Sequence, residues 1–135
     1  MRIATWNVNS IKQRIDNAVA WLKERAPDIV CLQETKCVDE SFPREPFEAL
    51  GYNVAVHGQK TFNGVAILSR LPFDEITPRL PGDPDDDHAR FIEAQVSTPT
   101  GILRVAVSRF LRFDQQRKVT SSPTGTLIRK IQPQW

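Results

Sequence analysis

The order of apolar and polar residues at the start of the chain predicts a strand, a helix and a second strand. Residues 2–6 have the pattern of a short strand, and residues 29–33 form an apolar run. Between them, Ser10 and Gln13 have the spacing of a capping box, which predicts a helix that begins there. Such a unit with short links predicts two parallel strands whose carboxyl ends share one edge of a sheet. The helix is supported by an apolar stripe and a closing proline: Ile11, Ile15, Val19, Leu22 and Pro27.

The next part of the chain predicts a short helix followed by an antiparallel meander. Pro43 suits the first turn of a helix that runs to about Leu50, and Gly51 suits the position after its end. The fold class expected from these patterns is α/β (α+β), with one mixed, mainly antiparallel sheet and flanking helices. The strands of the meander are predicted at residues 52–56, 65–68, 90–96 and 102–107, the last two joined as a hairpin by a turn at residues 98–101.

Composition adds only broad limits to this picture. The chain has 135 residues, 40% of them hydrophobic and 25% charged, which is ordinary for one soluble globular domain. No apolar stretch approaches the length of a membrane helix, so we expect no membrane association and a cytoplasmic location. The two cysteines, Cys31 and Cys37, lack the spacing of a zinc cluster and are expected to be free thiols.

The distribution of charge divides the chain into two parts. Residues 1–107 hold 12 Lys and Arg against 15 Asp and Glu, a net charge of −3. Residues 108–135 hold 6 against 1, a net charge of +5, and they lose the regular alternation of the preceding strands. We therefore expect a structured domain over 1–107 and a divergent tail over 108–135. A basic tail can bind nucleic acid through phosphates, although it can also be an unstructured segment without a role.

Two polar residues stand where the predicted parallel strands end. Asn7 follows the first strand and Glu34 follows the second. Ligands of α/β sheets gather beyond the carboxyl ends of parallel strands, so we expect these two side chains to meet. A carboxylate beside an amide suits a hard cation such as Mg²⁺, which takes oxygen ligands. On residue chemistry alone, a glutamate at a strand end is more often a surface or ion-paired residue.

Four stretches in order resemble the exodeoxyribonuclease III family of the exonuclease–endonuclease–phosphatase superfamily. They are TWNVNSIK at 5–12, DIVCLQETKC at 28–37, GYNVAVHGQKTFNGVAILSR at 51–70 and ARFIEAQV at 89–96. The resemblance implies a partial four-layer α/β sandwich, of which residues 1–107 would supply one sheet and part of its helical cover. An apolar sheet face would then remain in water, which predicts that the isolated chain is unstable or associates.

The resemblance also implies an activity and its residues. Relatives are Mg²⁺-dependent phosphodiesterases, with Mn²⁺ as an alternative metal, that cut DNA beside abasic sites and remove nucleotides from 3′ ends of duplexes. Glu34 matches the glutamate that holds the metal, and Asn7 matches the asparagine beside the metal and the attacked phosphate. Asn9 stands where some relatives carry aspartate, which puts a metal role for it in doubt. The positions that match contacts to the DNA backbone are Lys12, Lys36, Lys60, Phe62, Asn63 and Arg90.

Several of these positions have simpler explanations. Lys12 and Lys36 can be solvated, Phe62 and Asn63 can be turn residues, and Arg90 can pair with an acid of the DPDDD loop. No stable protein partner is expected from the sequence.

The resemblance stops after Val107. The family continues with a tyrosine loop, a GD-x-N word and a final Asp-His pair, and none of these has a counterpart here. The hypothesis that we favour is a frameshift or an early stop in the coding sequence, and the alternative is a native tail on a shortened binding module. We therefore expect the chain to be inactive alone. The other function classes are a noncatalytic nucleic-acid-binding fragment and a related phosphoesterase with a substrate other than DNA.

Overall fold

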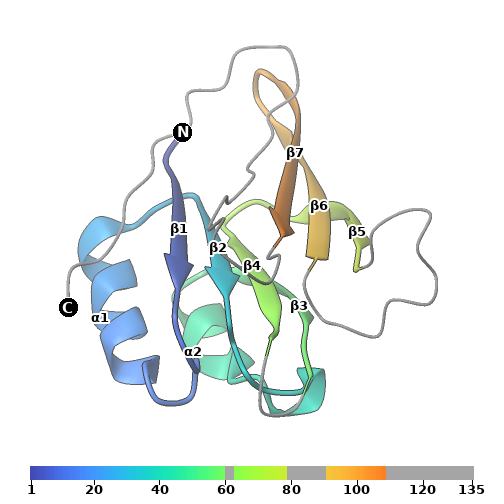
Figure 1. Cartoon of the computed structure of the whole chain (residues 1–135). Coiled ribbons are helices and arrows are strands. Elements are labelled where there is room, and N and C mark those ends of the chain that lie inside the picture. Colours follow the sequence, from blue (N-terminus) through green and yellow to red (C-terminus); the bar gives the residue numbers. More distant parts are fainter. Residues whose placement is uncertain (60–62, 79–90, 109–135) are drawn as a thin grey trace.

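The computed structural model describes residues 1–59, 63–78 and 91–108. Two β-sheets lie face to face, and two α-helices cover the outer side of the larger sheet (Figure 1). Within the described residues, no helix is long and apolar enough to cross a membrane. The elements in chain order are β1 (Ile3–Asn7), α1 (Ile15–Arg25), β2 (Ile29–Gln33), the 3₁₀ turn η1 (Asp39–Ser41), α2 (Arg44–Ala49), β3 (Asn53–His57), β4 (Val65–Ser69), β5 (Phe73–Thr77), β6 (Phe91–Thr98) and β7 (Gly101–Ser108).

The larger sheet has the strand order β1-β2-β4-β3. β1 and β2 are parallel, with Ile3 opposite Ile29 and Asn7 opposite Gln33. β4 is antiparallel to both β2 and β3. The strand–helix–strand unit and its parallel pairing are therefore confirmed, with the first strand one residue later than expected.

The first helix begins later than the capping box indicated. α1 starts at Ile15, and the residues before it form a turn. The Gln13 N–H does donate to Ser10 Oγ, at 3.4 Å. However, Ser10 has a φ of 85°, and its own N–H donates to the carbonyl of Glu34 at 2.8 Å. A residue in the left-handed region that is bound to another loop cannot open a helix, so the serine closes a turn instead.

The smaller sheet contains β5, β6 and β7 in that order, all antiparallel. The hairpin of β6 and β7 was predicted, and β5 was not. The expectation of one sheet is wrong, because β4 pairs with β2 and β3 and leaves the later strands to form a sheet of their own. Periodicity defines the faces of a strand but not the sheet that the strand joins. Among the described strands, β7 pairs only with β6.

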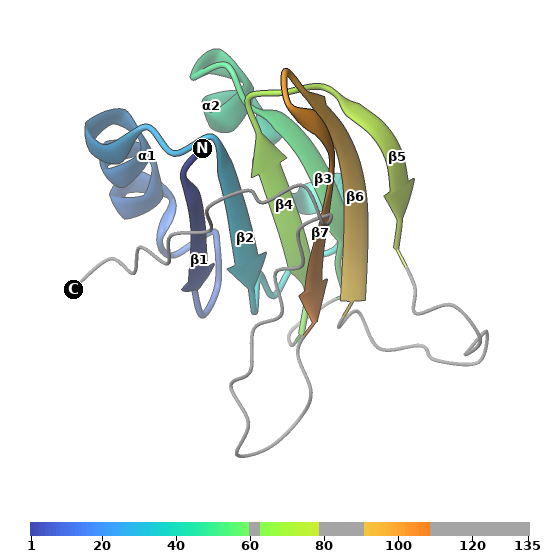
Figure 2. The ribbon, with the colours of Figure 1, turned by 90° about the horizontal axis from the view of Figure 1, so that it is seen from above.

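The two sheets lie against each other (Figure 2). Apolar side chains from both sheets form a buried layer between them. β7 contacts β2 and β4, while β6 contacts β3 and β4. This layer covers the sheet face that was expected to remain in water, so that face gives no reason to expect an unstable chain. The larger sheet contributes Ile3, Ile29, Cys31, Ala55, Val65 and Ile67, and the smaller one contributes Ile92, Ala94, Val96, Leu103, Val105 and Val107.

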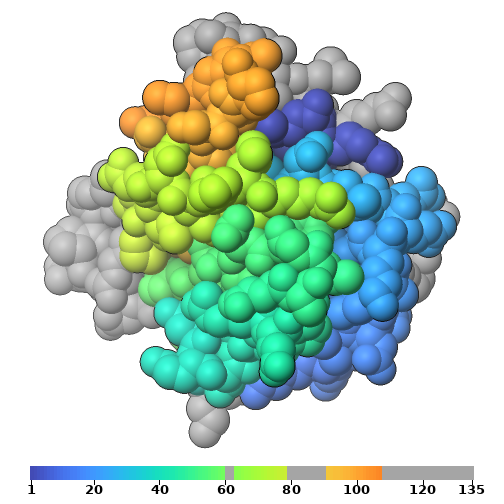
Figure 3. All heavy atoms as spheres, turned by 180° about the vertical axis from the view of Figure 1, so that it is seen from behind, coloured from blue at the N-terminus to red at the C-terminus, as the bar shows by residue number. Residues whose placement is uncertain are grey.

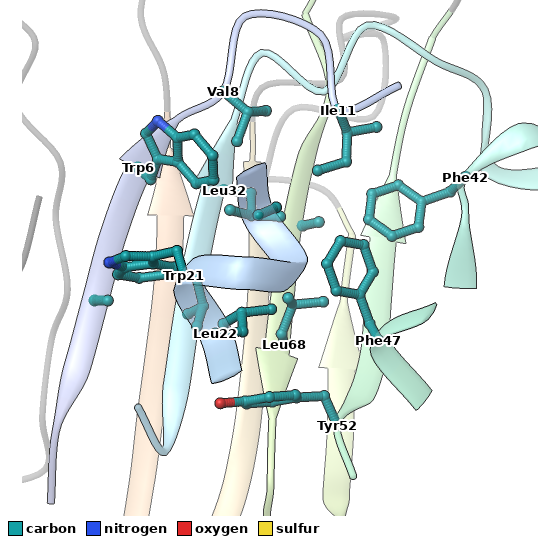
Figure 4. Packing of buried hydrophobic residues seen from close by; sticks show 14 of the residues in the cluster. Trp6, Val8, Ile11, Trp21, Leu22, Leu32, Phe42, Phe47, Tyr52 and Leu68 are labelled. Carbon is teal, nitrogen blue, oxygen red and sulfur yellow. The ribbon is translucent and has the colours of Figure 1, made fainter. Parts of the chain in front are cut away.

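A second core lies between the larger sheet and its helices. Trp6 and Trp21 meet edge to face, with 5.9 Å between ring centroids, which confirms them as core residues. Phe47 of α2 is fully buried in the same cluster, next to Phe42 (Figure 4). Figure 3 shows this helical side of the molecule, with α1 in blue and α2 in teal. The buried hydroxyl of Tyr52 donates to the Pro27 carbonyl at 2.6 Å, joining β3 to the end of the α1 segment.

Candidate functional site

The ends of β1 and β2 bring Asn7 and Glu34 to one edge of the sheet. Asn7 is the last residue of β1 and lies opposite Gln33, the residue before Glu34. The Val8 N–H continues the pairing by donating to the Gln33 carbonyl at 3.0 Å. Neighbouring strands are about 4.8 Å apart, so the two polar residues belong to adjacent chain segments. Both are half-buried. The expected backbone placement is confirmed, and the chemical roles stay predictions.

The loop after β1 is bound to the loop after β2. The Ser10 N–H donates to the Glu34 carbonyl at 2.8 Å, and the Ile11 N–H donates to the Thr35 carbonyl at 3.0 Å. These bonds continue beyond the last strand residues. The parallel pair therefore fixes the loops on both sides of the proposed site.

A third loop, which precedes β4, completes this edge. The Thr35 N–H donates to the Gly64 carbonyl at 3.2 Å, and the Lys36 N–H donates to the Asn63 carbonyl at 2.9 Å. Asn63 also donates from Nδ2 to Gln59 Oε1 at 2.8 Å. The order of strands in the sheet explains this contact, because β4 lies next to β2.

All three loops use left-handed backbone. This conformation is uncommon for residues other than glycine, and it persists where surrounding contacts enforce it. The hydrogen bonds between the loops provide such contacts at this sheet edge. The residues and their φ angles are Asn9 (45°), Ser10 (85°), Glu34 (54°), Lys36 (54°), Asn63 (57°) and Gly64 (96°).

The donor chemistry at this edge fits a hard cation in part. Asn7 Oδ1 accepts the Asn9 N–H at 3.1 Å, which orients the amide and leaves its carbonyl oxygen a second lone pair. With the Glu34 carboxylate this gives two kinds of oxygen ligand that Mg²⁺ accepts alongside water. Within the described residues, no group of three or more His, Cys, Asp and Glu could hold a metal ion. Two oxygen-bearing residues alone fall short of a complete coordination shell, and their role as metal ligands stays a prediction.

Lys36 and Asn9 form a polar contact beside this pair. Lys36 Nζ donates to Asn9 Oδ1 at 2.5 Å, and Lys36 is half-buried rather than simply solvated. An ammonium group on the Asn9 oxygen disfavours a cation at that atom, which agrees with the doubt about a metal role for Asn9. Lys12 is exposed. Lys60, Phe62 and Arg90 lie outside the described residues.

Three buried residues near the edge, Thr5, Gln33 and Thr35, were not singled out from the sequence. Gln33 is 2% exposed, and its Nε2 donates to Thr5 Oγ1 at 2.9 Å and to the Cys31 carbonyl at 3.3 Å. Its Oε1 has no hydrogen-bond partner in the described part of the chain. Thr35 is 2% exposed. The QET motif at 33–35 and the Asn-Gly pair at 63–64 indicated which segments form the edge, but they did not predict the side-chain contacts of these buried residues.

A hollow of about 670 Å³ lies elsewhere on the molecule. Arg44, Tyr52 and Asn53 contribute to its lining. Asn53 is opposite Ser69, which is opposite Ile29, so the hollow is at the end of the sheet remote from Asn7 and Glu34. It is therefore separate from the polar edge described above.

Comparison with known proteins places the chain among nucleases and phosphatases. Residues 4–134 match the family described as the endonuclease/exonuclease/phosphatase family. The exodeoxyribonuclease III of Haemophilus influenzae is 35% identical over 123 residues, which cover 91% of this chain and 46% of that protein. The predicted boundary at residue 107 stays a prediction, because the family match continues beyond it.

Two solved structures resemble the fold. A 3′ phosphatase from Neisseria, bound to a product DNA hairpin, is 40% identical with a TM-score of 0.73 and covers 78% of this chain and 40% of its own. An AP endonuclease from Archaeoglobus fulgidus is 39% identical with a TM-score of 0.72 and covers 79% and 40%. The chain thus spans less than half the length of these relatives and matches their amino-terminal part.

Proposed function

The chain belongs to the endonuclease/exonuclease/phosphatase family, and we propose on that premise that it is the amino-terminal half of a DNA-repair nuclease of exodeoxyribonuclease III type. The substrate class is duplex DNA at abasic sites and 3′ ends, and the metal is Mg²⁺ or Mn²⁺. The observation that carries this proposal is the arrangement of Asn7 and Glu34 at the ends of adjacent parallel strands, beside three interlinked loops.

Each residue of the edge has a proposed task. Glu34 would hold the metal ion, and Asn7 would lie beside it and orient the phosphate through its amide. When bound, such an ion stabilises the negative charge that develops on a phosphate under attack. Lys36 and Lys12 would attract the DNA backbone without reading its sequence. A base or water-positioning group is also needed, and we propose that this chain does not supply it and is inactive alone.

Metal binding provides the direct test of the site. We expect the full chain to bind Mn²⁺, measured by electron paramagnetic resonance of the free ion, and Glu34→Gln to weaken binding at least tenfold because a charged oxygen ligand is lost. Glu24→Gln serves as the matched control, since Glu24 is an exposed acid on α1. Equal Mn²⁺ affinity in the two variants would overturn the assignment of Glu34.

Cleavage of DNA tests the second part of the proposal. A duplex with a single abasic site, incubated with Mg²⁺ and the chain, should remain uncut above background on a denaturing gel. Cutting that disappears in Glu34→Gln would show that the chain is active as it stands.

A noncatalytic nucleic-acid-binding role is the second candidate, favoured by the net charge of +5 in residues 108–135. In that case DNA affinity would fall steeply with salt and remain unchanged in Glu34→Gln. Fluorescence anisotropy of a labelled duplex over a salt series distinguishes this role from metal-dependent recognition.

A further inference from the structure

Thr35 connects the three loops of the polar edge. Its carbonyl accepts the Ile11 N–H at 3.0 Å from the first loop, and its N–H donates to the Gly64 carbonyl at 3.2 Å in the third. Its side chain is almost completely buried and makes a hydrogen bond with the Cys37 thiol. Both backbone polar groups and the hydroxyl of this one residue are therefore used to hold it in place.

The two neighbours of Thr35 have unusual backbone conformations. Glu34 and Lys36 both have a φ of 54°, in the left-handed region. Such a conformation is unfavourable for a residue with a side chain, because the Cβ approaches the following carbonyl oxygen. If Thr35 were free to move, the strain in its neighbours would relax toward extended or right-handed backbone. The direction of the Glu34 side chain would change with it, since φ and ψ set the orientation of the Cα–Cβ bond.

Gly64 makes the close approach to Thr35 possible. A Cβ at position 64 would overlap Thr35 Oγ1 and would come within 3.2 Å of the Lys36 nitrogen. Gly64 also has a φ of 96°. Gly51 offers a comparison, because it has a similar φ of 90° but nothing within 4 Å of the position that a Cβ would take.

We propose that the Thr35–Gly64 contact is a positioning element that holds the backbone of Glu34 left-handed and so aims its carboxylate at the metal. This inference rests on the proposed function, in which Glu34 is the metal ligand. Thr35 and Gly64 are therefore positioning residues, which act on Glu34 and do not themselves contact the substrate. The contact acts on metal binding through Glu34.

The test replaces each glycine by alanine. Gly64→Ala should weaken Mn²⁺ binding at least tenfold and shift the ¹³Cα and ¹³Cβ resonances of Glu34 away from left-handed values. Gly51→Ala should leave the affinity within about twofold and the Glu34 resonances unchanged. In the double variant, Thr35→Ala removes the atom with which the new methyl group collides. Gly64→Ala with Thr35→Ala should therefore recover at least threefold of the lost affinity.

The variant Tyr52→Phe distinguishes a general loss of stability from a specific loss of Glu34 positioning. It removes a buried hydrogen bond far from the edge. It should lower the melting temperature and keep both the Mn²⁺ affinity and the Glu34 resonances. If Gly64→Ala does not fold, Thr35→Gly takes its place. That variant keeps the space at Gly64 but frees the Thr35 backbone, so it should produce the same loss and the same shift.

Each outcome decides a separate point. Unchanged Glu34 resonances in folded Gly64→Ala or Thr35→Gly would overturn the inference, whether or not metal binds. A double variant no better than Gly64→Ala would also count against it. Equal Mn²⁺ binding by the wild-type chain and Glu34→Gln would instead remove the proposed function, and the resonances would still report on positioning.

Discussion

At the scale of single residues, Cys31 has a property that follows from its place between the sheets. It is a free thiol, and burial raises its pKa from 9.0 to about 12. Because the pKa is higher in the folded chain than in the unfolded one, the folded state binds more protons between these two values. This contribution to stability is present below pH 9 and is lost as the pH rises toward 12.

We therefore expect the free energy of unfolding to decrease between pH 9 and 12, and to decrease less in Cys31→Ala. Urea unfolding followed by circular dichroism at several pH values measures both. Other groups titrate in this range in both proteins, so the difference between the two curves isolates the thiol. Parallel curves would contradict the expectation.

Tyr52 gives a prediction based on one hydrogen bond. Its hydroxyl donates to the Pro27 carbonyl at 2.6 Å in a buried place. Tyr52→Phe removes the donor and leaves that carbonyl without it, so the unfolding free energy should fall by about 1–2 kcal/mol. Urea unfolding at pH 7 provides the measurement, and a change below about 0.5 kcal/mol would show that the carbonyl finds another donor.

The sequence was informative about residues whose position depends on local patterns. Asn7 and Glu34 could be placed at one sheet edge because both follow apolar strands of a single strand–helix–strand unit. Thr35 and Gly64 could not be paired, since 29 residues separate them in the chain and only the position of β4 next to β2 brings them together. The same applies to Thr5 and Gln33.

At the scale of elements, prediction succeeded where one face of the element is apolar. β6 and β7 alternate regularly and were found, whereas β5 has the sequence FDEIT and three exposed residues in its centre. Its pairing with β6 also contains an irregularity between Phe73 and Glu75. A short edge strand with few buried side chains carries little periodicity, so the sequence alone did not reveal it.

α2 is short, and its attachment depends on Phe47. This side chain is fully buried and packs against Phe42 with 5.9 Å between ring centroids. Phe47→Ala should lower the unfolding free energy by about 3–5 kcal/mol because it removes apolar contacts and leaves a cavity. Ile76→Ala in β5, where the side chain is 43% exposed, should cost much less. Comparable losses in denaturant unfolding would mean that Phe47 does not anchor the helix.

At the scale of the whole molecule, the two cores share their central strands. β2 and β4 are buried along their full length, with side chains in both the helix-side core and the core between the sheets. Neither core can lose its packing while the other keeps these strands in place. The division of the strands into two sheets could not be predicted, because it depends on which apolar faces meet in three dimensions.

This sharing predicts one cooperative unfolding transition. Trp6 and Trp21 report on the helix-side core, and far-ultraviolet circular dichroism reports on both sheets. In a Trp135→Phe background the two signals should have the same denaturant midpoint. A circular dichroism midpoint below the tryptophan midpoint would show that the smaller sheet unfolds first, and either order of separate midpoints would contradict a single transition.

Because both faces of β2 and β4 are buried, something other than burial must fix the register of these strands. A strand that is apolar on both faces could shift its register by one residue without exposing an apolar side chain to water. Hydrophobic burial therefore does little to fix the register of such a strand. The buried hydrogen bond from Gln33 Nε2 to Thr5 Oγ1, at 2.9 Å, favours one register of β2 against β1. Sliding β2 past β1 would turn the amide toward the opposite layer, among aliphatic groups that cannot accept its protons. This polar pair inside the sheet thus favours the register that places Glu34 next to Asn7 at the sheet edge.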